Sequence, residues 1–331
     1  MKLRLSIGMA SNPRTWPILD GKVKPDGIDL ISTVVHPSEL FWRQLRFADF
    51  DVSEMSFSSL MMTKANGDDR WLGLPIFTTR RFFHTDTLVR RDARIETPAD
   101  LKGRRVGVPE YQQTAALWAR GVLLHEFGVE PKDIEFWMER TPSHSHRAAV
   151  GFAAPPGVTI HQIPPDKNIG AMMLSGELEA TLFYLVDPTN LVDRSTADLW
   201  NHPDIKPLFT DPVAEGIRFY QKTGLYPINH GMMIKREIAE KHPWTVLNLL
   251  KAFNRANDLA NEQRMEHVSY YLTAGLLPRD AKQALSTPLI RHGIEANRKV
   301  LETAAQYSHE QGLTPRLVRL DEVFAASAMS Q

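Results

Sequence analysis

Apolar and polar side chains alternate between strand and helix periods over the first hundred residues. The strand-like segments lie at residues 2–7, 27–34, 51–55, 71–77 and 87–90. Between them, residues 36–47 and 58–64 carry apolar side chains at helical spacing. Because strands and helices take turns along the chain, the pattern predicts an open α/β sheet rather than a helical bundle or a β-sandwich.

A second α/β unit begins after a Thr-Pro turn at residues 97–103. Its predicted strands lie at residues 105–108, 134–138, 158–163 and 180–184, and its predicted helices at residues 114–127 and 166–177. The stretch at residues 141–168 is rich in Pro, Gly and His, which predicts loops around the one short strand in it.

The chain then returns through a strand at residues 228–234 to a largely helical C-terminal part. Prolines and glycines divide that part near residues 243, 275–278, 288 and 312–315. We therefore predict a first lobe of residues 1–90 plus 225–331, and a second lobe of residues 91–224. The C-terminal helices either pack on the first lobe or join two copies of the chain, so the sequence leaves homo-oligomerisation open.

Composition narrows the classes of partner. The 331 residues are 43% hydrophobic and 24% charged, which is typical of a globular protein with a sizeable core. Lys plus Arg and Asp plus Glu both number 39, and this balance argues against nucleic acid or an acidic membrane surface as a partner. There is no cysteine, which excludes disulfides, thiolate nucleophiles and Cys-bound metals.

The N-terminal residues bear on the location of the protein, and the motifs of the whole chain bear on its cofactors. Polar residues and a proline interrupt the apolar positions of residues 1–16, whereas a secretory signal needs a continuous apolar region of about 7–15 residues. No apolar run approaches the roughly 20 residues that span a bilayer. We therefore expect a cytoplasmic protein. The chain also lacks a Gly-rich dinucleotide motif and a P-loop, so we expect no organic cofactor.

Two short motifs indicate a fold. Residues 100–109 read Asp-Leu-Lys-Gly-Arg-Arg-Val-Gly-Val-Pro, and residues 175–182 read Ser-Gly-Glu-Leu-Glu-Ala-Thr-Leu. Both resemble segments of type II solute-binding proteins of the nitrate and taurine kind. The resemblance implies an α/β, two-lobed type II periplasmic-binding-protein-like fold with a helical C-terminal extension. A helix N-terminus after the first motif would present N–H donors to an anion.

Four longer segments resemble the 4,5-dihydroxyphthalate decarboxylase family. They are residues 74–84, residues 106–115 with the Pro-Glu-Tyr-Gln-Gln-Thr-Ala sequence, residues 181–184, and residues 226–234. This resemblance implies a cytoplasmic carboxy-lyase of phthalate degradation, which converts 4,5-dihydroxyphthalate to 3,4-dihydroxybenzoate (protocatechuate) without oxidation. The alternative is a solute-binding protein of the ABC-transporter type for an aromatic or other small carboxylate.

Loss of CO2 from an aromatic ring requires a proton for the ring carbon and a base for a ring hydroxyl. Histidine titrates near neutral pH, which makes His84 and His230 candidate acids or bases. Glu110 is a candidate base as well, or it only adds favourable negative charge at a helix N-terminus. The resemblance implies these three as catalytic residues, and the sequence does not decide which of them donates the proton.

A small aromatic dicarboxylate also needs polar groups that bind it. Arg80 and Arg81 lie beside aromatic residues, and guanidinium groups pair with carboxylates and stack on rings. Adjacent strand residues point to opposite sides, so we expect only one of the two to reach a given ligand. The other predicted binding residues are Arg14, Glu54, Ser56, Tyr111, Gln112, Thr114, His146, Arg147 and Tyr184.

The His144-Ser-His146-Arg147 sequence can be a polar loop without a role, and it has two functional interpretations. Two histidines at i and i+2 share one face of an extended segment and could hold a divalent metal with a nearby carboxylate. Alternatively, one histidine or Arg147 contacts the substrate directly. We favour the second interpretation and predict no metal.

Overall fold

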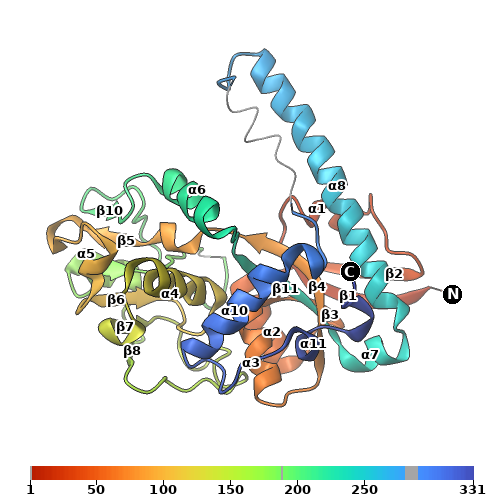
Figure 1. The fold of residues 1–331 in the computed structure, drawn as a ribbon, viewed down its shortest axis with the longest axis horizontal. Helices are drawn as coiled ribbons and strands as arrows, with labels where there is room; N and C mark the ends of the chain where they lie inside the picture. The colour runs from red at the N-terminus through yellow and green to blue at the C-terminus, as the bar shows by residue number, and fades with distance from the viewer. Residues whose placement is uncertain (1, 188, 280–289) are drawn as a thin grey trace.

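The computed structural model describes residues 2–187, 189–279 and 290–331. Its first sheet has the strand order β2-β1-β3-β11-β4. These strands are β1 Leu3–Met9, β2 Ile28–Val34, β3 Val52–Ser56, β4 Trp71–Arg80 and β11 Ile228–Lys235. β1 pairs in parallel with β2 and β3, while β11 runs antiparallel to β3 and β4. Figure 1 shows this sheet beside a second one.

The second sheet has the strand order β10-β5-β9-β6-β7-β8. Its strands are β5 Leu88–Arg90, β6 Arg105–Val108, β7 Glu135–Met138, β8 Thr159–Gln162, β9 Ala180–Thr181 and β10 Ile205–Pro207. The strands β6, β7, β8 and β9 form its parallel part. β5 lies between β9 and β10 and is antiparallel to both. Two sheets with helices around each agree with the predicted fold class.

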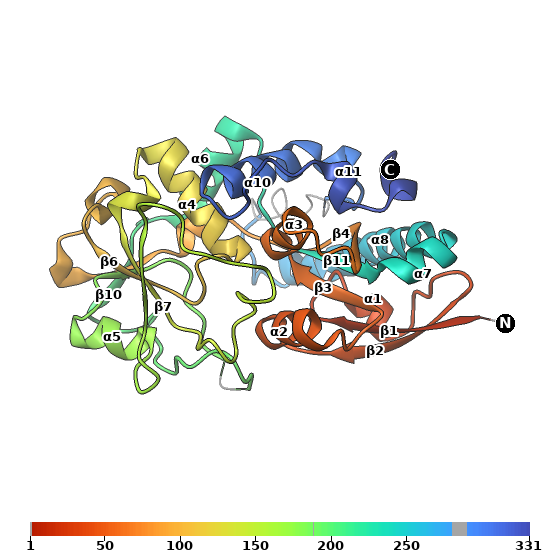
Figure 2. The same ribbon diagram turned by 90° about the horizontal axis from the view of Figure 1, so that it is seen from below.

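Helices cover both sheets and bridge them (Figure 2). They are α1 Trp16–Leu19, α2 Pro37–Phe47, α3 Phe57–Ala65, α4 Thr114–Phe127, α5 Ile169–Ser175, α6 Pro212–Thr223, α7 Arg236–Lys241, α8 Trp244–Thr273, α10 Arg298–Glu310 and α11 Leu320–Val323. α10 contacts both α3 and α4, and the Trp118 indole of α4 donates to the Ile228 carbonyl of β11 at 2.9 Å. The two sheets therefore share one continuous apolar core, which includes Phe57, Trp118 and Phe324.

Two predicted elements are shorter in the structure, and some observed elements were not predicted. The strand predicted at residues 180–184 ends at Thr181, because Phe183 has a φ of 62° that takes the chain out of the extended conformation. The strand β10 and the helix α6 were not predicted at all. The helix predicted at residues 166–177 is the shorter α5. The break predicted at residue 288 lies outside the described residues.

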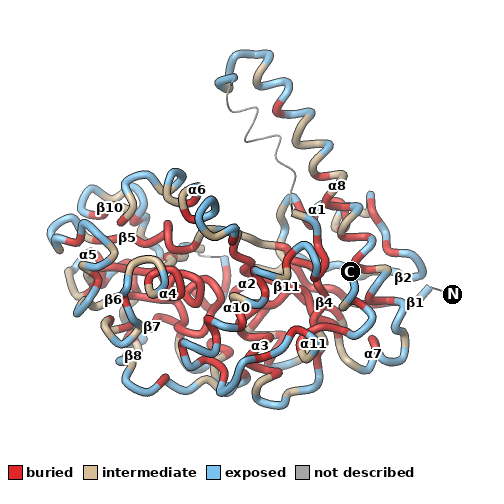
Figure 3. Tube along the Cα trace, viewed as in Figure 1, coloured by how far each residue is buried: buried red, intermediate tan, exposed pale blue. Residues whose placement is uncertain are grey.

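The long helix α8 extends away from the body of the protein (Figures 1 and 3). Its first half is buried against the first sheet through Leu249 and Phe253, whereas Tyr270 and Tyr271 near its end are exposed. Residues 2–187, 189–279 and 290–331 contain no helix with both the length and the apolar character needed to cross a bilayer.

Candidate functional site

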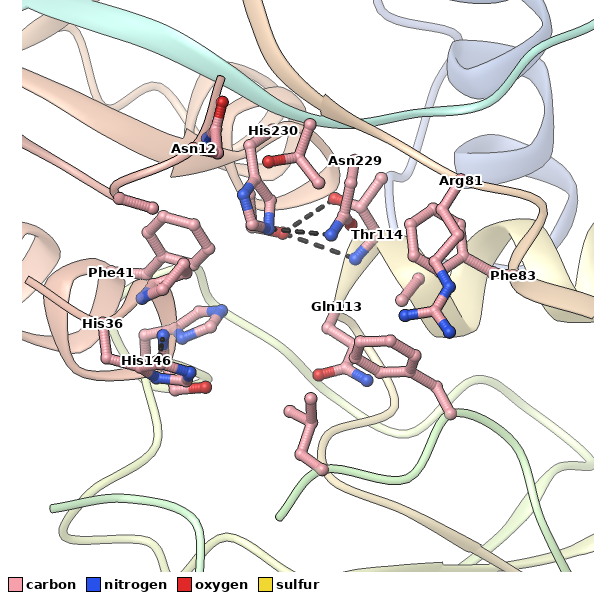
Figure 4. A pocket seen from close by; sticks show the side chains of 18 of the residues that line it. Asn12, His36, Phe41, Arg81, Phe83, Gln113, Thr114, His146, Asn229 and His230 are labelled. Atoms are coloured by element: carbon pink, nitrogen blue, oxygen red, sulfur yellow. Dashed lines mark hydrogen bonds between the residues drawn. The ribbon is translucent and has the colours of Figure 1, made fainter. Parts of the chain in front are cut away.

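A cavity of about 260 Å³ lies between the two sheets (Figure 4). His230 and Asn229 of β11 form one wall, and His36, Phe41 and His146 form the next. The rest of the lining includes Asn12, Ser38, Ser56, Thr79, Arg81, Phe83, Gln113, Thr114, Ala115, Arg140, Phe183 and Leu185. Strand ends, helix N-termini and loops therefore meet at this cavity, as expected for ligand sites in open α/β sheets.

His230 forms a hydrogen-bonded pair with a buried carboxylate. Its Nδ1 lies 2.8 Å from Glu54 Oε1, and its Nε2 lies 2.8 Å from the Asn229 amide nitrogen. Since an amide nitrogen only donates, Nε2 accepts and Nδ1 carries the proton toward Glu54. The β11–β4 pairing is irregular on both sides of His230, which aims this side chain into the cavity.

Glu54 is ionised in this arrangement. Its side chain is fully buried, and burial alone would raise its pKa. Hydrogen bonds outweigh that penalty and leave the pKa below its ordinary value: Glu54 accepts from His230, from Thr78 Oγ1 at 2.5 Å and from the Ala10 N–H at 2.7 Å. The carboxylate thus fixes the tautomer of His230 and can balance a positive charge on its ring.

A second charged network lies behind the opposite wall and centres on Arg140. Arg140 donates to Asp193 Oδ1 at 2.9 Å, pairs with Glu110 Oε2 at 3.3 Å and also bonds the Ser38 hydroxyl. His146 Nδ1 lies 3.2 Å from the same Glu110 oxygen, and its Nε2 lies 2.9 Å from the Ser59 hydroxyl. Burial lowers the pKa of His146, so its imidazole is neutral at pH 7.

The N-terminus of α4 also faces the cavity. Gln113, Thr114 and Ala115 line it, and no side chain caps the helix at Gln113. Thr114 Oγ1 accepts from the Ser58 N–H at 2.9 Å and lies 2.8 Å from the Ser56 hydroxyl, which ties α4 to the start of α3. Two helix N-termini converge here, and their partial positive charge favours an anionic group.

Phe41, Phe83, Phe183 and Leu185 give the cavity an apolar side. Phe183 packs edge-on against Phe83 with ring centroids 5.5 Å apart. Its positive φ is uncommon for a bulky residue and carries strain of about 1–3 kcal/mol, the kind of strain that recurs at functional sites. The chain leaves the second sheet at this point and directs Phe183 into the cavity.

This strain predicts an unusual order of stability. Because glycine accepts φ near 60° without a Cβ clash, Phe183→Gly should be more stable than Phe183→Ala by about 1 kcal/mol. At Phe83, which has no positive φ, the order should reverse by about 0.5–1 kcal/mol. Urea unfolding of the four variants measures both differences, and the same order at both positions would contradict the assignment of strain to Phe183.

Arg81 is the exposed cation of the cavity. Its guanidinium pairs with Asp86 at 2.7 Å, and the Arg81 side chain is 54% exposed while that of Asp86 is 7% exposed. Burial raises the pKa of Asp86 to about 6 even though Arg81 opposes the shift. A ligand anion that draws Arg81 away must therefore compete with the Asp86 carboxylate, which stays buried.

The raised pKa of Asp86 makes stability depend on pH. Between about pH 4 and pH 6 the folded protein holds a proton that the unfolded chain releases, so the free energy of unfolding falls as pH rises through that window. Asp86→Asn removes this loss. Its stability relative to wild type should therefore be higher at pH 7 than at pH 4 by about 2–3 kcal/mol. Urea unfolding at both pH values measures it, and Asp92→Asn, an exposed control, should show no such gain.

The cavity collects five of the predicted site residues, namely Ser56, Arg81, Thr114, His146 and His230. Glu54 and Glu110 lie directly behind it and contact His230, His146 and Arg140. Arg14 and Arg80 line a neighbouring cavity instead. Figure 4 shows His230, His146, Thr114 and Arg81 around the same space.

Five other predicted residues lie outside the lining of both cavities. His84 is buried against Phe82 and Phe219, with its Nε2 3.1 Å from Glu215. Tyr111 stacks under the Arg120 guanidinium, the Gln112 carbonyl accepts from Ser58, Arg147 donates to Gln162, and Tyr184 donates to the Ala197 carbonyl. The structure thus does not bring these side chains to the site, and their predicted functional roles stay predictions.

The sequence did not point to His36, Arg140, Gln113 or Asn229. Asn229 adjoins His230, and Gln113 adjoins Thr114, so both could have been chosen from the same motifs. His36 and Arg140 follow strands β2 and β7, where ligand residues are common. Burial lowers the pKa of His36, whose Nε2 lies 3.3 Å from Asp187.

The residues proposed for a metal do not assemble. His144 contacts the Trp42 ring and the Thr141 and Ser143 hydroxyls, while His146 contacts Ser59. Over the part of the chain that the structure describes, no group of three or more His, Asp and Glu side chains has the geometry to hold a metal ion.

The amino-acid sequence is similar to a known family model and to known proteins. The family model described as NMT1/THI5 like matches residues 70–174. A 4,5-dihydroxyphthalate decarboxylase of Comamonas testosteroni is 31% identical over 333 residues, which covers 99% of this chain and 98% of the relative. A 4,5-dihydroxyphthalate decarboxylase of Pseudomonas putida is 33% identical over 220 residues, which covers 66% of this chain and 82% of the relative.

Solved structures share the fold at lower identity. The alkanesulfonate-binding protein SsuA of Xanthomonas axonopodis pv. citri is 15% identical, with a TM-score of 0.56 and coverage of 98% of both chains. The desulfurization enzyme DSZB is 16% identical, with a TM-score of 0.55 and coverage of 99% of this chain and 98% of that one. These matches confirm the two-lobed type II binding-protein fold that the sequence predicted.

Proposed function

Because the chain belongs to the 4,5-dihydroxyphthalate decarboxylase family, we propose that it removes CO2 from 4,5-dihydroxyphthalate or a closely related aromatic dicarboxylate. The product would be 3,4-dihydroxybenzoate. The observation that carries the proposal is the Glu54–His230 pair, in which a buried carboxylate orients an imidazole whose Nε2 faces a cavity. Such a pair is suited to proton transfer near neutral pH.

The cavity offers different surroundings to the two carboxylates of such a substrate. The retained carboxylate fits the N-terminus of α4 at Gln113 to Ala115, with Arg81 nearby. The departing carboxylate fits the apolar side formed by Phe41, Phe183 and Leu185. A carboxylate in apolar surroundings gains little binding energy, and its loss as neutral CO2 is then favoured over its retention.

We assign the proton transfer to His230. When Nε2 also carries a proton, the Asn229 amide must turn its oxygen toward it, and the ring is then an imidazolium whose charge Glu54 balances at 2.8 Å. This proton goes to the ring carbon as its bond to the carboxylate breaks, and the electron pair of that bond stays on the ring. His146 lines another wall as a neutral imidazole, and its two ring nitrogens already lie beside Glu110 and the Ser59 hydroxyl.

The test is turnover. The purified protein is incubated with 4,5-dihydroxyphthalate while CO2 release and the ultraviolet spectrum are followed, with phthalate as the matched substrate that lacks both hydroxyls. We expect stoichiometric CO2 and 3,4-dihydroxybenzoate from the first and none from phthalate. Tight binding of the substrate without any CO2 would instead favour a solute-binding role, as would recovery of the protein outside the cytoplasm of its host.

A further inference from the structure

A second cavity of about 520 Å³ lies next to the one just described. Asn12 and Thr79 line both cavities, so the two spaces share a wall. The second is bounded by Arg14, by β4 through Arg80, and by α6 through Tyr220. Arg264 of α8 and Ile290 also line it.

Arg14 and Arg80 bring two positive charges to this cavity, which Arg264 also lines, and neither of the two pairs with a carboxylate among the described residues. Arg14, which is 6% exposed, donates to the carbonyls of Phe77 and Ile290 and to the side-chain oxygen of Asn257. Arg80 donates to the Tyr226 carbonyl at 3.0 Å and to the Asn297 side chain. No carboxylate of residues 2–187, 189–279 or 290–331 forms an ion pair with either guanidinium.

The pKa values of Arg14, Arg80 and His292 are all lowered around this cavity. Burial lowers the pKa of Arg14 to about 10, and burial together with Arg14 lowers that of Arg80 to about 9. Burial and the same two arginines hold the pKa of His292 well below its ordinary value. Both guanidinium groups nevertheless stay charged at pH 7, and buried charges without a counter-ion are costly.

The catalytic cavity differs in this respect. Its two arginines, Arg81 and Arg140, are already paired with Asp86 and with Glu110 and Asp193. A ligand anion there competes with carboxylates of the protein, whereas an anion beside Arg14 and Arg80 meets no such competitor among the described residues. The stronger anion affinity therefore belongs to the second cavity.

Aromatic walls indicate what kind of anion fits. Phe82, Tyr220 and Tyr226 line the second cavity, and the Phe82 and Tyr226 rings lie 4.9 Å apart. The Arg80 guanidinium lies 5.9 Å from the centre of the Tyr226 ring. A planar ring with one carboxylate can stack on these side chains while its oxygens meet the guanidinium groups.

We propose that Arg14 and Arg80 form a second binding site, which takes a small aromatic monocarboxylate beside the catalytic cavity. The site retains or admits molecules of the product's chemical class without acting on them. The test of this site measures only ligand binding. A negative result would therefore rule out the second site without bearing on the proposed decarboxylation.

The experiment is a calorimetric titration with benzoate at constant ionic strength. We expect two benzoate sites on the wild-type protein, of which Arg80→Gln weakens one by more than 10-fold. Tyr220→Ala should weaken the same site several-fold, and Tyr220 is 48% exposed, so this variant keeps the fold. Arg4→Gln, which removes an exposed positive charge, should leave both sites unchanged.

Three results would overturn the proposal. One is a wild-type protein with no benzoate site that Arg80→Gln weakens, and another is a Tyr220→Ala variant that keeps its full affinity for benzoate. The third is benzamide binding as tightly as benzoate, because recognition would then not depend on charge. Without benzoate, Arg80→Gln should melt no lower than wild type, since it removes a buried charge that lacks a carboxylate partner among the described residues.

Discussion

Replacing His230 by Asn should lower kcat about 10²–10⁴-fold while KM changes much less. Asparagine keeps a polar side chain of similar reach in the cavity wall, so the substrate still binds, but it cannot donate a proton to the ring carbon. Glu54→Gln should also depress kcat, because a neutral amide at 2.8 Å from Nδ1 neither fixes the tautomer nor balances an imidazolium. Steady-state kinetics with 4,5-dihydroxyphthalate measure both parameters.

His84→Asn is the matched control for this experiment. His84 is as buried as His230 and is also paired with a carboxylate, but its partner is Glu215 on α6 and it lies outside the cavity lining. The substitution should lower the melting temperature and leave kcat within about threefold of wild type, because it removes a buried hydrogen bond to Glu215 and no group of the site. A loss of kcat at His84 equal to that at His230 would move the proton donor to His84.

The contrast between these two histidines shows what periodicity could predict. His84 follows a strand-like segment and His230 lies within one, and both lie in segments that resemble the same family. His230 is paired across the sheet with Ser56 at the end of β3, so its place at a strand end leads directly to the cavity. His84 lies in a short 3₁₀ turn that faces α6, and α6 was not predicted. Because α6 was not predicted, the sequence did not reveal Glu215, the buried partner of His84.

The helix α6 left signals in the sequence. Asp211 caps it, Pro212 occupies its first turn and Gly224 ends it in the left-handed conformation. Only Gly216 and Phe219 of this helix are buried, and the apolar residues Val213, Ile217 and Tyr220, which recur at helical spacing, are exposed. α4, by contrast, was predicted with its observed limits because it is apolar throughout and ends at Gly128.

The arginines show how strand geometry divides neighbouring residues between sites. Arg80 ends β4 and lines the second cavity, while Arg81 lines the first. The alternation of side chains along a strand predicted that only one would reach a given ligand. It did not predict a second cavity, which depends on how α6, α8 and the segment around Arg14 pack together. Such packing is set by contacts far apart in the sequence.

Arg140→Met should cost about 3–5 kcal/mol of folding free energy, the largest effect on stability that we expect. The substitution keeps the length and apolar volume of the side chain but leaves Glu110 and Asp193 buried without their cation. Burial disfavours the charged form of Arg140 itself, yet the two carboxylates outweigh this and raise its pKa above the ordinary value. Glu110 and Asp193 therefore keep Arg140 charged, and Arg140 in turn stabilises the two buried carboxylates.

The pH dependence of this loss has a definite sign. Without Arg140, Glu110 and Asp193 are buried beside each other without a cation, and burial favours the protonated form of a carboxyl group over its ion. Stability that depends on their protonated forms is present at low pH and is lost as pH rises, so the deficit relative to wild type should be smaller at pH 5 than at pH 8. Urea unfolding at both pH values measures it.

A triple variant separates charge from packing. Combining Arg140→Met with Glu110→Gln and Asp193→Asn removes every charge of the network, and it should recover most of the lost stability, since neutral replacement of a whole buried ion cluster is tolerated far better than removal of one member. Arg4→Met, at an exposed position, should stay within about 0.5 kcal/mol of wild type. If the triple variant is no more stable than Arg140→Met and the deficit is the same at both pH values, the role of Arg140 is to fill space behind the cavity rather than to neutralise its carboxylates.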